Sequence, residues 1–165
     1  MQHIITALVE NKPGMLARIV GLVSGRGYNI ETLNVGPTQD PTLSKMTLVV
    51  PGDAHVLRQV TLQVSKLVDV LRVTDVTGKR HIDRELILVE IATESVAQRT
   101  EILDLATLFD AEIAGVSQCS ITLQLAADSN VISDFMLLLK PYHILDLSRS
   151  GRIAVAHTNN GDSPA

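Results

Sequence analysis

Cysteine and aromatic residues are nearly absent from this chain of 165 residues, which has one cysteine, no tryptophan, two tyrosines and two phenylalanines. A single cysteine cannot form an internal disulfide, which is typical of a protein of the reducing cytoplasm. So few rings cannot form a surface on which sugars or nucleobases stack. The net charge is −4 and no run of lysine or arginine occurs, so the clustered positive charge that binds phosphate backbones is missing. We therefore expect a cytoplasmic chain with no nucleic acid partner.

Long apolar runs are missing as well. No stretch approaches the roughly 18 to 20 apolar residues that span a bilayer. Residues 1–6 lack the positive region and the apolar stretch of a signal peptide. The hydrophobic residues, 45% of the chain, are instead expected to form the core of one domain or of two small ones. We expect no membrane contact.

Recognisable catalytic and metal-binding motifs are also absent from the sequence. The histidines are far apart, and no two of them have ligand spacing on one element. Cys119 has no neighbouring histidine and is expected to be an inert thiol. Residues 25–30 resemble the start of a dinucleotide fingerprint, but Ile30 stands where the third glycine belongs. We expect no catalytic residue and no metal site.

Hydrophobic periodicity in the first half predicts the order β-α-β-β-α-β. Apolar residues at helical spacing begin at Leu16, and a second such stripe follows Asp53, a candidate N-cap. Alternation over 45–50 is typical of a half-buried strand. Strands are further expected over 3–9, 28–36 and 68–76.

The second half repeats this order. Helical stripes run from Ile102 to Phe109 and from Val131 to Leu139. Extended segments are expected at 86–91, 111–117, 120–125 and 143–156, the last of them broken at Gly151. The sequence predicts an α+β fold with two ferredoxin-like βαββαβ domains, each an antiparallel sheet with its helices on one face. Their expected bounds are 1–77 and 78–157, and 158–165 is expected to be a disordered tail. Because several strands are apolar on both sides, part of the open face should be covered by another domain or subunit.

One segment has the features of a binding site. Pro13 presets φ near the first helical turn, and Gly14 leaves the helix start uncovered, so that free N–H groups can attract a small carboxylate. Asn11 and Asn29 offer neutral amide oxygens for an ammonium group. Leu16, Ile30 and Leu33 are candidate apolar walls. The pattern suits a small hydrophobic amino acid, although Asn-x-Pro-Gly is also simply a good turn and cap.

These residues also carry a resemblance to a known family. Residues 10–18, Glu-Asn-Lys-Pro-Gly-Met-Leu-Ala-Arg, and 25–31, Gly-Arg-Gly-Tyr-Asn-Ile-Glu, resemble the opening of an ACT domain, an amino-acid-sensing module. More specifically, they resemble the small regulatory subunit of acetolactate synthase (acetohydroxyacid synthase). Segments 40–47, 63–73, 84–89 and 149–154 fit the same subunit, while 139–147 follows its pattern loosely.

The resemblance implies a non-catalytic subunit in branched-chain amino acid biosynthesis. Such a subunit binds a large catalytic subunit, activates it, and confers feedback inhibition by valine or a related amino acid. Thiamine diphosphate, magnesium and FAD would belong to the large subunit, and none to this chain. The resemblance also implies a homodimer in which two ACT domains join edge to edge, with Asn11, Lys12, Pro13, Gly14, Met15 and Leu16 of one chain facing Asn29 and Ile30 of the other.

Two other interpretations stay open at this point. One is a stand-alone amino-acid-binding ACT module that regulates a different enzyme. The other is a free-standing enzyme of ferredoxin-like fold whose active site has no recognisable motif.

Overall fold

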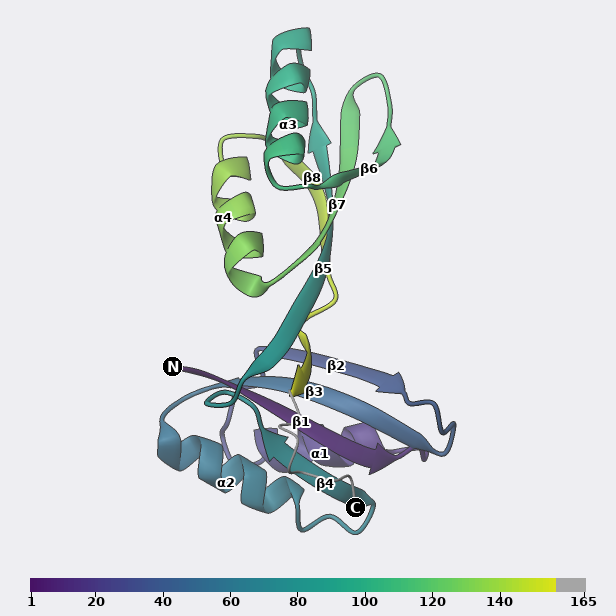
Figure 1. Ribbon diagram of the computed structural model, residues 1–165, viewed down its shortest axis with the longest axis vertical. Coiled ribbons are helices and arrows are strands. Elements are labelled where there is room, and N and C mark those ends of the chain that lie inside the picture. The colour runs from purple at the N-terminus through teal and green to yellow at the C-terminus, as the bar shows by residue number, and fades with distance from the viewer. Residues whose placement is uncertain (157–165) are drawn as a thin grey trace. The chain divides into compact units, whose positions relative to one another are not determined.

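The structure, a computed structural model, describes residues 1–156 (Figure 1). The described chain divides into two compact units, residues 1–83 together with 152–156, and residues 84–151. The expected tail at 158–165 lies outside the described residues. Each unit contains two helices and four strands in the βαββαβ order; the first has a four-stranded antiparallel sheet, and the sheet of the second gains a fifth strand from the end of the described chain. The predicted α+β fold with two βαββαβ domains is confirmed.

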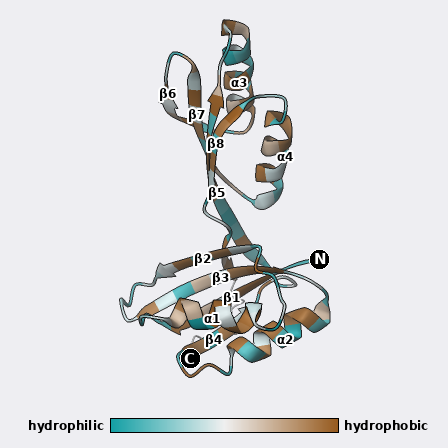
Figure 2. Ribbon diagram, turned by 180° about the vertical axis from the view of Figure 1, so that it is seen from behind, coloured by the Kyte–Doolittle hydropathy of each residue, from teal (hydrophilic) through white to brown (hydrophobic). Residues whose placement is uncertain are grey.

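The first unit has the sheet order β2-β3-β1-β4. Central strands β1 and β3 pair over their full length, from Gln2 opposite Pro51 to Glu10 opposite Leu43. Figure 2 shows these two strands largely in the colour of hydrophobic residues, as expected for the middle of a sheet. The elements are β1 (Gln2–Glu10), α1 (Met15–Ser24), β2 (Thr32–Pro37), β3 (Leu43–Pro51), α2 (Ala54–Val64) and β4 (Val70–Asp75).

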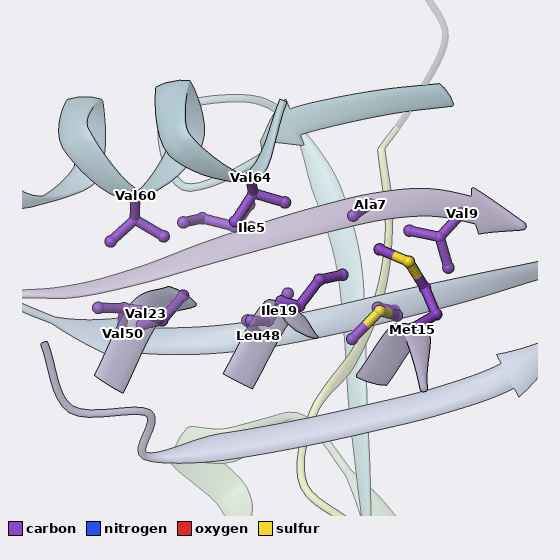
Figure 3. Packing of buried hydrophobic residues seen from close by; sticks show 11 residues of the cluster. Ile5, Ala7, Val9, Met15, Ile19, Val23, Leu48, Val50, Val60 and Val64 are labelled. Carbon is purple, nitrogen blue, oxygen red and sulfur yellow. The ribbon is translucent and has the colours of Figure 1, made fainter. Parts of the chain in front are cut away.

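The core of the first unit lies between its helices and one face of its sheet. Alternate residues of β1 and β3 point toward Ile19 and Val23 of α1 and toward Val60 of α2 (Figure 3). This arrangement follows from the period of two in the strands and the period of 3.6 in the helices. The core comprises Ile5, Ala7, Val9, Met15, Ile19, Val23, Met46, Leu48, Val50, Val60 and Val64.

The second unit repeats the arrangement with the strand order β6-β7-β5-β8. Its helices pack on one sheet face around Phe135, whose ring centroid lies 5.1 Å from that of Phe109. Glu85 is buried, and its carboxylate accepts two hydrogen bonds from Arg149, at 2.7 and 3.0 Å. The elements are β5 (His81–Ala92), α3 (Val96–Leu108), β6 (Glu112–Val116), β7 (Ser120–Ala127), α4 (Ser129–Leu139) and β8 (Ile144–Arg149).

The last strand, β9 (Ile153–Ala156), pairs with β5 and is grouped with the first unit. The sequence predicts an extended segment over 143–156 that is broken at Gly151, and Gly151, with φ of 73°, does separate β8 from β9. In β9, Ala154 is buried with Ile4, Val49 and Val76. Ile4 and Val49 are a cross-strand pair whose side chains lie on the face away from the helices. We expected another domain or subunit to cover the open face; over this part of the sheet, residues 153–156 of the same unit cover it instead.

The division between the units also differs from the expected bounds of 1–77 and 78–157. It falls after Asp83, because β5 begins at His81 and continues without a break from the first unit into the second. Residues 152–156 return to the first unit because its open face offers them an apolar surface.

Candidate effector site

A tight turn connects β1 to α1. The Met15 N–H donates to the Lys12 carbonyl at 3.2 Å, and Gly14 between them has φ of 84° and ψ of −7°. These angles are those of the third residue of a type II turn, a position that favours glycine, and proline is common just before it. Pro13 therefore shapes the turn, and the helix begins after Gly14.

The start of α1 is unlike the other helix starts in the described chain. Side chains of Asp53, Ser95 and Asp128 cap α2, α3 and α4, whereas no side chain caps α1. Among the described residues the N–H groups of Leu16 and Ala17 make no hydrogen bond. Nothing lies within 4 Å of the position that a Cβ would take on Gly14. The N-terminus is therefore an open, positively polarised surface that suits an anion.

Asn11 is held by the loop between β2 and β3. Its backbone N–H donates to the Thr42 carbonyl at 2.7 Å, and its side-chain Nδ2 donates to the Pro41 carbonyl at 3.0 Å. The amide nitrogen is thus committed, while the amide oxygen has no donor among the described residues. That oxygen remains available to an ammonium group.

Lys12 belongs to an ion-pair cluster next to the turn. Its ammonium pairs with the Glu10 carboxylate and lies 3.7 Å from Asp69, which also accepts a hydrogen bond of 2.7 Å from Arg18. The bond to Glu10, with further attraction from Asp69, raises the pKa of Lys12 above its usual value. The positive charge is therefore largely balanced, so Lys12 fixes the turn more than it offers charge to a ligand.

The apolar candidates divide between core and surface. Met15 is buried and points to Val9 in the core (Figure 3), so only its backbone can face a ligand. Leu16 is 45% exposed. Ile30 and Leu33 are half-buried against the core.

Asn29 and Ile30 lie at the other end of the sheet from Asn11. Glu31, which follows them, bonds to Gln2 at the start of β1, whereas Asn11 follows the end of β1. The nine-residue strand separates these ends by roughly 27 Å, at about 3.4 Å per residue. Asn29 is exposed, and its side-chain amide has no partner among the described residues. One chain therefore does not bring the two groups of candidate residues together.

The corresponding helix start in the second unit is closed. Ser95 caps α3, and Gln98 accepts a hydrogen bond from the Glu94 N–H at 2.8 Å. Arg99 donates to Thr93 and to the carbonyls of Ser117 and Gln118. The features that suit an amino acid occur at α1 and not at α3.

Further residues that shape the site were not predicted from the sequence. Glu10, Arg18 and Asp69 hold the turn, and Pro41 holds Asn11. Asp69 is 51 residues from Arg18, and no periodic pattern shows such a pairing. Within residues 1–156 no group of three or more His, Cys, Asp or Glu residues could hold a metal ion. No helix in this part of the chain is long and apolar enough to cross a membrane.

Each of the two units matches a known protein family. Residues 5–72 match the family of acetolactate-synthase (AHAS) small subunit-like ACT domains, and residues 84–158 match the small subunit of acetolactate synthase. The probable acetolactate synthase small subunit of Archaeoglobus fulgidus is 41% identical over 96% of this chain and 99% of its own length. The chain belongs to the acetolactate synthase small subunit family.

Other members of the family agree with this assignment. The small subunit of acetolactate synthase isozyme 3 from Escherichia coli is 40% identical over 94% of this chain and 96% of its own. The crystal structure of the small subunit from Thermotoga maritima, 28% identical, covers 96% of this chain and 99% of its own, with a TM-score of 0.87. As an acetolactate synthase small subunit, the protein is a regulatory partner of a catalytic large subunit and is not itself catalytic.

Proposed function

We propose that this small subunit binds a branched-chain amino acid at the start of α1 and thereby imposes feedback inhibition on the catalytic subunit, which it otherwise activates. The observation that carries the proposal is the uncapped start of α1, where Gly14 leaves open space beside the unbonded N–H groups of Leu16 and Ala17. The other three helices of residues 1–156 each have a side-chain cap, so among them only α1 has this opening.

The chemistry of the site matches the parts of a branched-chain amino acid. The effector carboxylate accepts hydrogen bonds from the N–H groups at the start of α1, where the helix dipole favours a negative charge. The oxygen of the Asn11 amide accepts from the ammonium group. Leu16 and Ile30 supply apolar surface for an aliphatic side chain, whose burial contributes about 25 cal/mol per Å².

A second copy of the chain would complete the site. β2 is an edge strand of the sheet, and an edge of unpaired backbone groups favours pairing with another strand. Pro37, at the end of β2, pairs with Ser44, which also pairs with Val9 near the Asn11 end of β1. The end of β2 therefore lies on the same side of the sheet as Asn11, and the start of β2 follows Asn29 and Ile30. If two β2 strands pair antiparallel about a two-fold axis, the start of β2 in one chain lies beside the end of β2 in the other. Asn29 and Ile30 of one chain then lie near Asn11 of its partner.

The chemistry of the reaction is assigned to the large subunit, in the cytoplasm. Thiamine diphosphate, magnesium and FAD would be held there. We expect the isolated small subunit to form no acetolactate even when all three are supplied. Added to the large subunit, it should raise the rate of acetolactate formation, and a valine titration should then lower that rate. The proposal would be contradicted if the pure small subunit formed acetolactate. It would also be contradicted if valine, leucine and isoleucine all left the rate of the mixture unchanged.

A mixture of two variants tests whether two chains build each site. Asn29→Ala removes a hydrogen bond to a charged ligand group, worth about 1.5 to 3 kcal/mol, so valine should bind about ten to a hundred times more weakly. Asn11→Ala should weaken binding by the same mechanism. If the site is shared, a heterodimer of the two variants has one doubly damaged site and one intact site.

Calorimetry on that mixture, after subunit exchange is verified, should show a class of sites with wild-type affinity for valine. Each variant alone is the matched control and should show none. If each chain instead forms a complete site, every site in the mixture carries one defect, and no high-affinity class appears. That result would overturn the shared site.

A further inference from the structure

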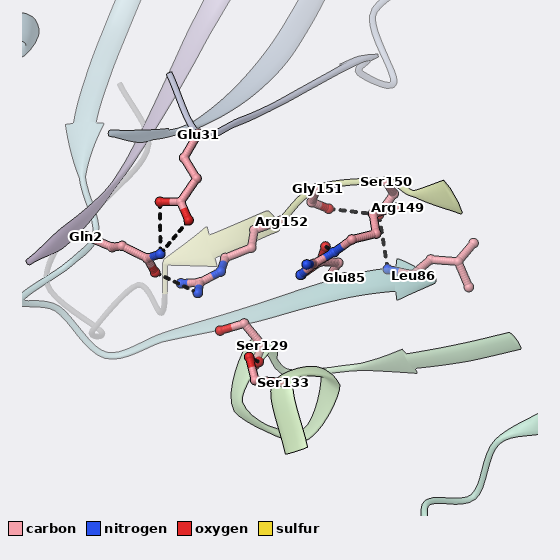
Figure 4. A network of polar contacts seen from close by, with 10 residues as sticks. All are labelled: Gln2, Glu31, Glu85, Leu86, Ser129, Ser133, Arg149, Ser150, Gly151 and Arg152. Carbon is pink, nitrogen blue, oxygen red and sulfur yellow. Dashed lines mark hydrogen bonds and ion pairs between the residues drawn. The ribbon is translucent and has the colours of Figure 1, made fainter. Parts of the chain in front are cut away.

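Three polar side chains connect the segment Asn29–Ile30 to the residue that precedes β9. Gln2 lies between Glu31 and Arg152 (Figure 4). Its Nε2 donates to both carboxylate oxygens of Glu31, at 2.8 Å each, and its Oε1 accepts from Arg152 Nη2 at 2.9 Å. The charges at the two ends fix the amide orientation, because a flipped amide would put oxygen against carboxylate and nitrogen against guanidinium.

All three residues belong to the first unit. Arg152 is the first residue of the chain after Gly151, where the second unit ends. It leads directly into β9, whose Ala154 is buried against Ile4 and Val49. Val49 also holds the start of β2, because its carbonyl accepts from the Glu31 N–H at 2.8 Å. The backbone of Glu31 is therefore held by Val49, which packs against β9, and its side chain is held by Gln2, which bonds to Arg152 just before β9.

Glu31 in turn fixes the segment before it. At the far side of this segment the Tyr28 N–H donates to the Val23 carbonyl at 3.3 Å. Asn29 and Ile30 thus lie between two residues, Tyr28 and Glu31, that hydrogen bonds hold in place. The exposed Asn29 side chain makes no hydrogen bond among the described residues. The direction of its amide depends on how firmly Glu31 is held.

We infer that Arg152 and Gln2 are positioning residues for the effector site. The three hydrogen-bonded side chains of Arg152, Gln2 and Glu31, called the relay below, couple effector binding to the packing of β9 on the first unit. This inference rests on the proposed function, since it assumes that Asn29 and Ile30 contact the effector. Coupling between two sites is reciprocal. The relay therefore raises affinity for the effector, and a bound effector holds β9 more tightly on the first unit.

Calorimetry with L-valine on the full-length small subunit tests the relay. Arg152→Gln should weaken valine binding about three- to tenfold, the effect of losing one exposed hydrogen bond and the order it maintains. Gln2→Leu, which removes all three hydrogen bonds of the amide, should do the same. The double variant should be no weaker than either single variant, because both changes break one relay. Arg58→Gln is the matched control, as Arg58 is exposed on α2 and its side chain makes no contact with the relay.

Hydrogen exchange supplies a readout that a merely structural role would not change. In the wild-type chain valine should slow amide exchange in β9, and in Gln2→Leu this slowing should be lost. Any one of three results would overturn the relay while leaving the proposed function intact. These are wild-type affinity for valine in Arg152→Gln, additive losses of affinity in the double variant, and amide exchange in β9 that valine does not change. A wild-type chain that binds neither valine, leucine nor isoleucine would overturn the proposed function, and the relay with it.

Discussion

Replacing Gly14 with aspartate is expected to abolish inhibition by valine while leaving activation of the catalytic subunit largely intact. The new side chain meets no protein atom, since nothing lies within 4 Å of the Cβ position, so the turn can accept it sterically. The φ of 84° adds strain of roughly 1 kcal/mol. The added carboxylate then lies at the helix start, where it occupies the N–H groups and repels the effector carboxylate at close range.

Two further variants at Gly14 separate charge from shape. Gly14→Asn has the size of aspartate without its charge and tolerates a positive φ, so it should retain more inhibition than Gly14→Asp. Gly14→Ala carries the backbone strain alone and should retain the most. The measurement is acetolactate formation by the reconstituted enzyme across a valine titration. An inhibition curve of Gly14→Asp at the wild-type position would place the effector site elsewhere.

Replacing Arg149 with methionine is expected to destabilise the second unit by about 3 kcal/mol. The Glu85 side chain is 1% exposed, and Arg149 is the residue that donates two hydrogen bonds to it. Without that partner the carboxylate is left as an uncompensated buried charge, which typically costs 3 to 5 kcal/mol. The lower end of this range applies because the Arg149 side chain is 46% exposed and the pair is partly solvated.

A double variant shows whether the buried charge is the cause. Glu85→Gln combined with Arg149→Met leaves a neutral amide in place of the carboxylate, and it should recover part of the lost free energy of unfolding. Urea unfolding followed by circular dichroism measures both variants. Equal losses in the single and the double variant would show that the methionine, and not the unpaired charge, is responsible. Valine binding at the first unit should be unaffected in either.

The periodic parts of this fold could be predicted from the sequence. The stripe beginning at Leu16 predicts α1 to within one residue of its start, and the alternation over 120–125 predicts a strand. The stripe from Ile102 predicts only the second half of α3, which begins at Val96. The type of turn at Pro13 and Gly14 is likewise local information. Local patterns carry this information because each depends on neighbours a few residues apart.

The position of β9 could not be predicted in the same way. Apolar residues at 153–156 indicate a strand, but they do not show which sheet face will bury them. Ile4 and Val49 determine that face, because their apolar side chains lie on the side of the sheet away from the helices. Both precede β9 by more than a hundred residues. The pairing of Arg18 with Asp69 is hidden for the same reason. A residue that offers a free amide, such as Asn29, can be identified from sequence, whereas the residues that fix its direction cannot.

The return of residues 152–156 to the first unit has a consequence for synthesis of the protein on the ribosome. Most of the first unit emerges early, but the part of its open face around Ile4 and Val49 stays uncovered until residues 152–156 have left the exit tunnel. The contact of Ala154 with Ile4 spans almost the whole chain, and such contacts form late because they close a long loop. A nascent chain would therefore expose Ile4 and Val49 throughout translation of the second unit. We expect ribosome-bound chains stalled at residue 151 to expose more apolar surface and to exchange amide hydrogens in β1 faster than the released protein.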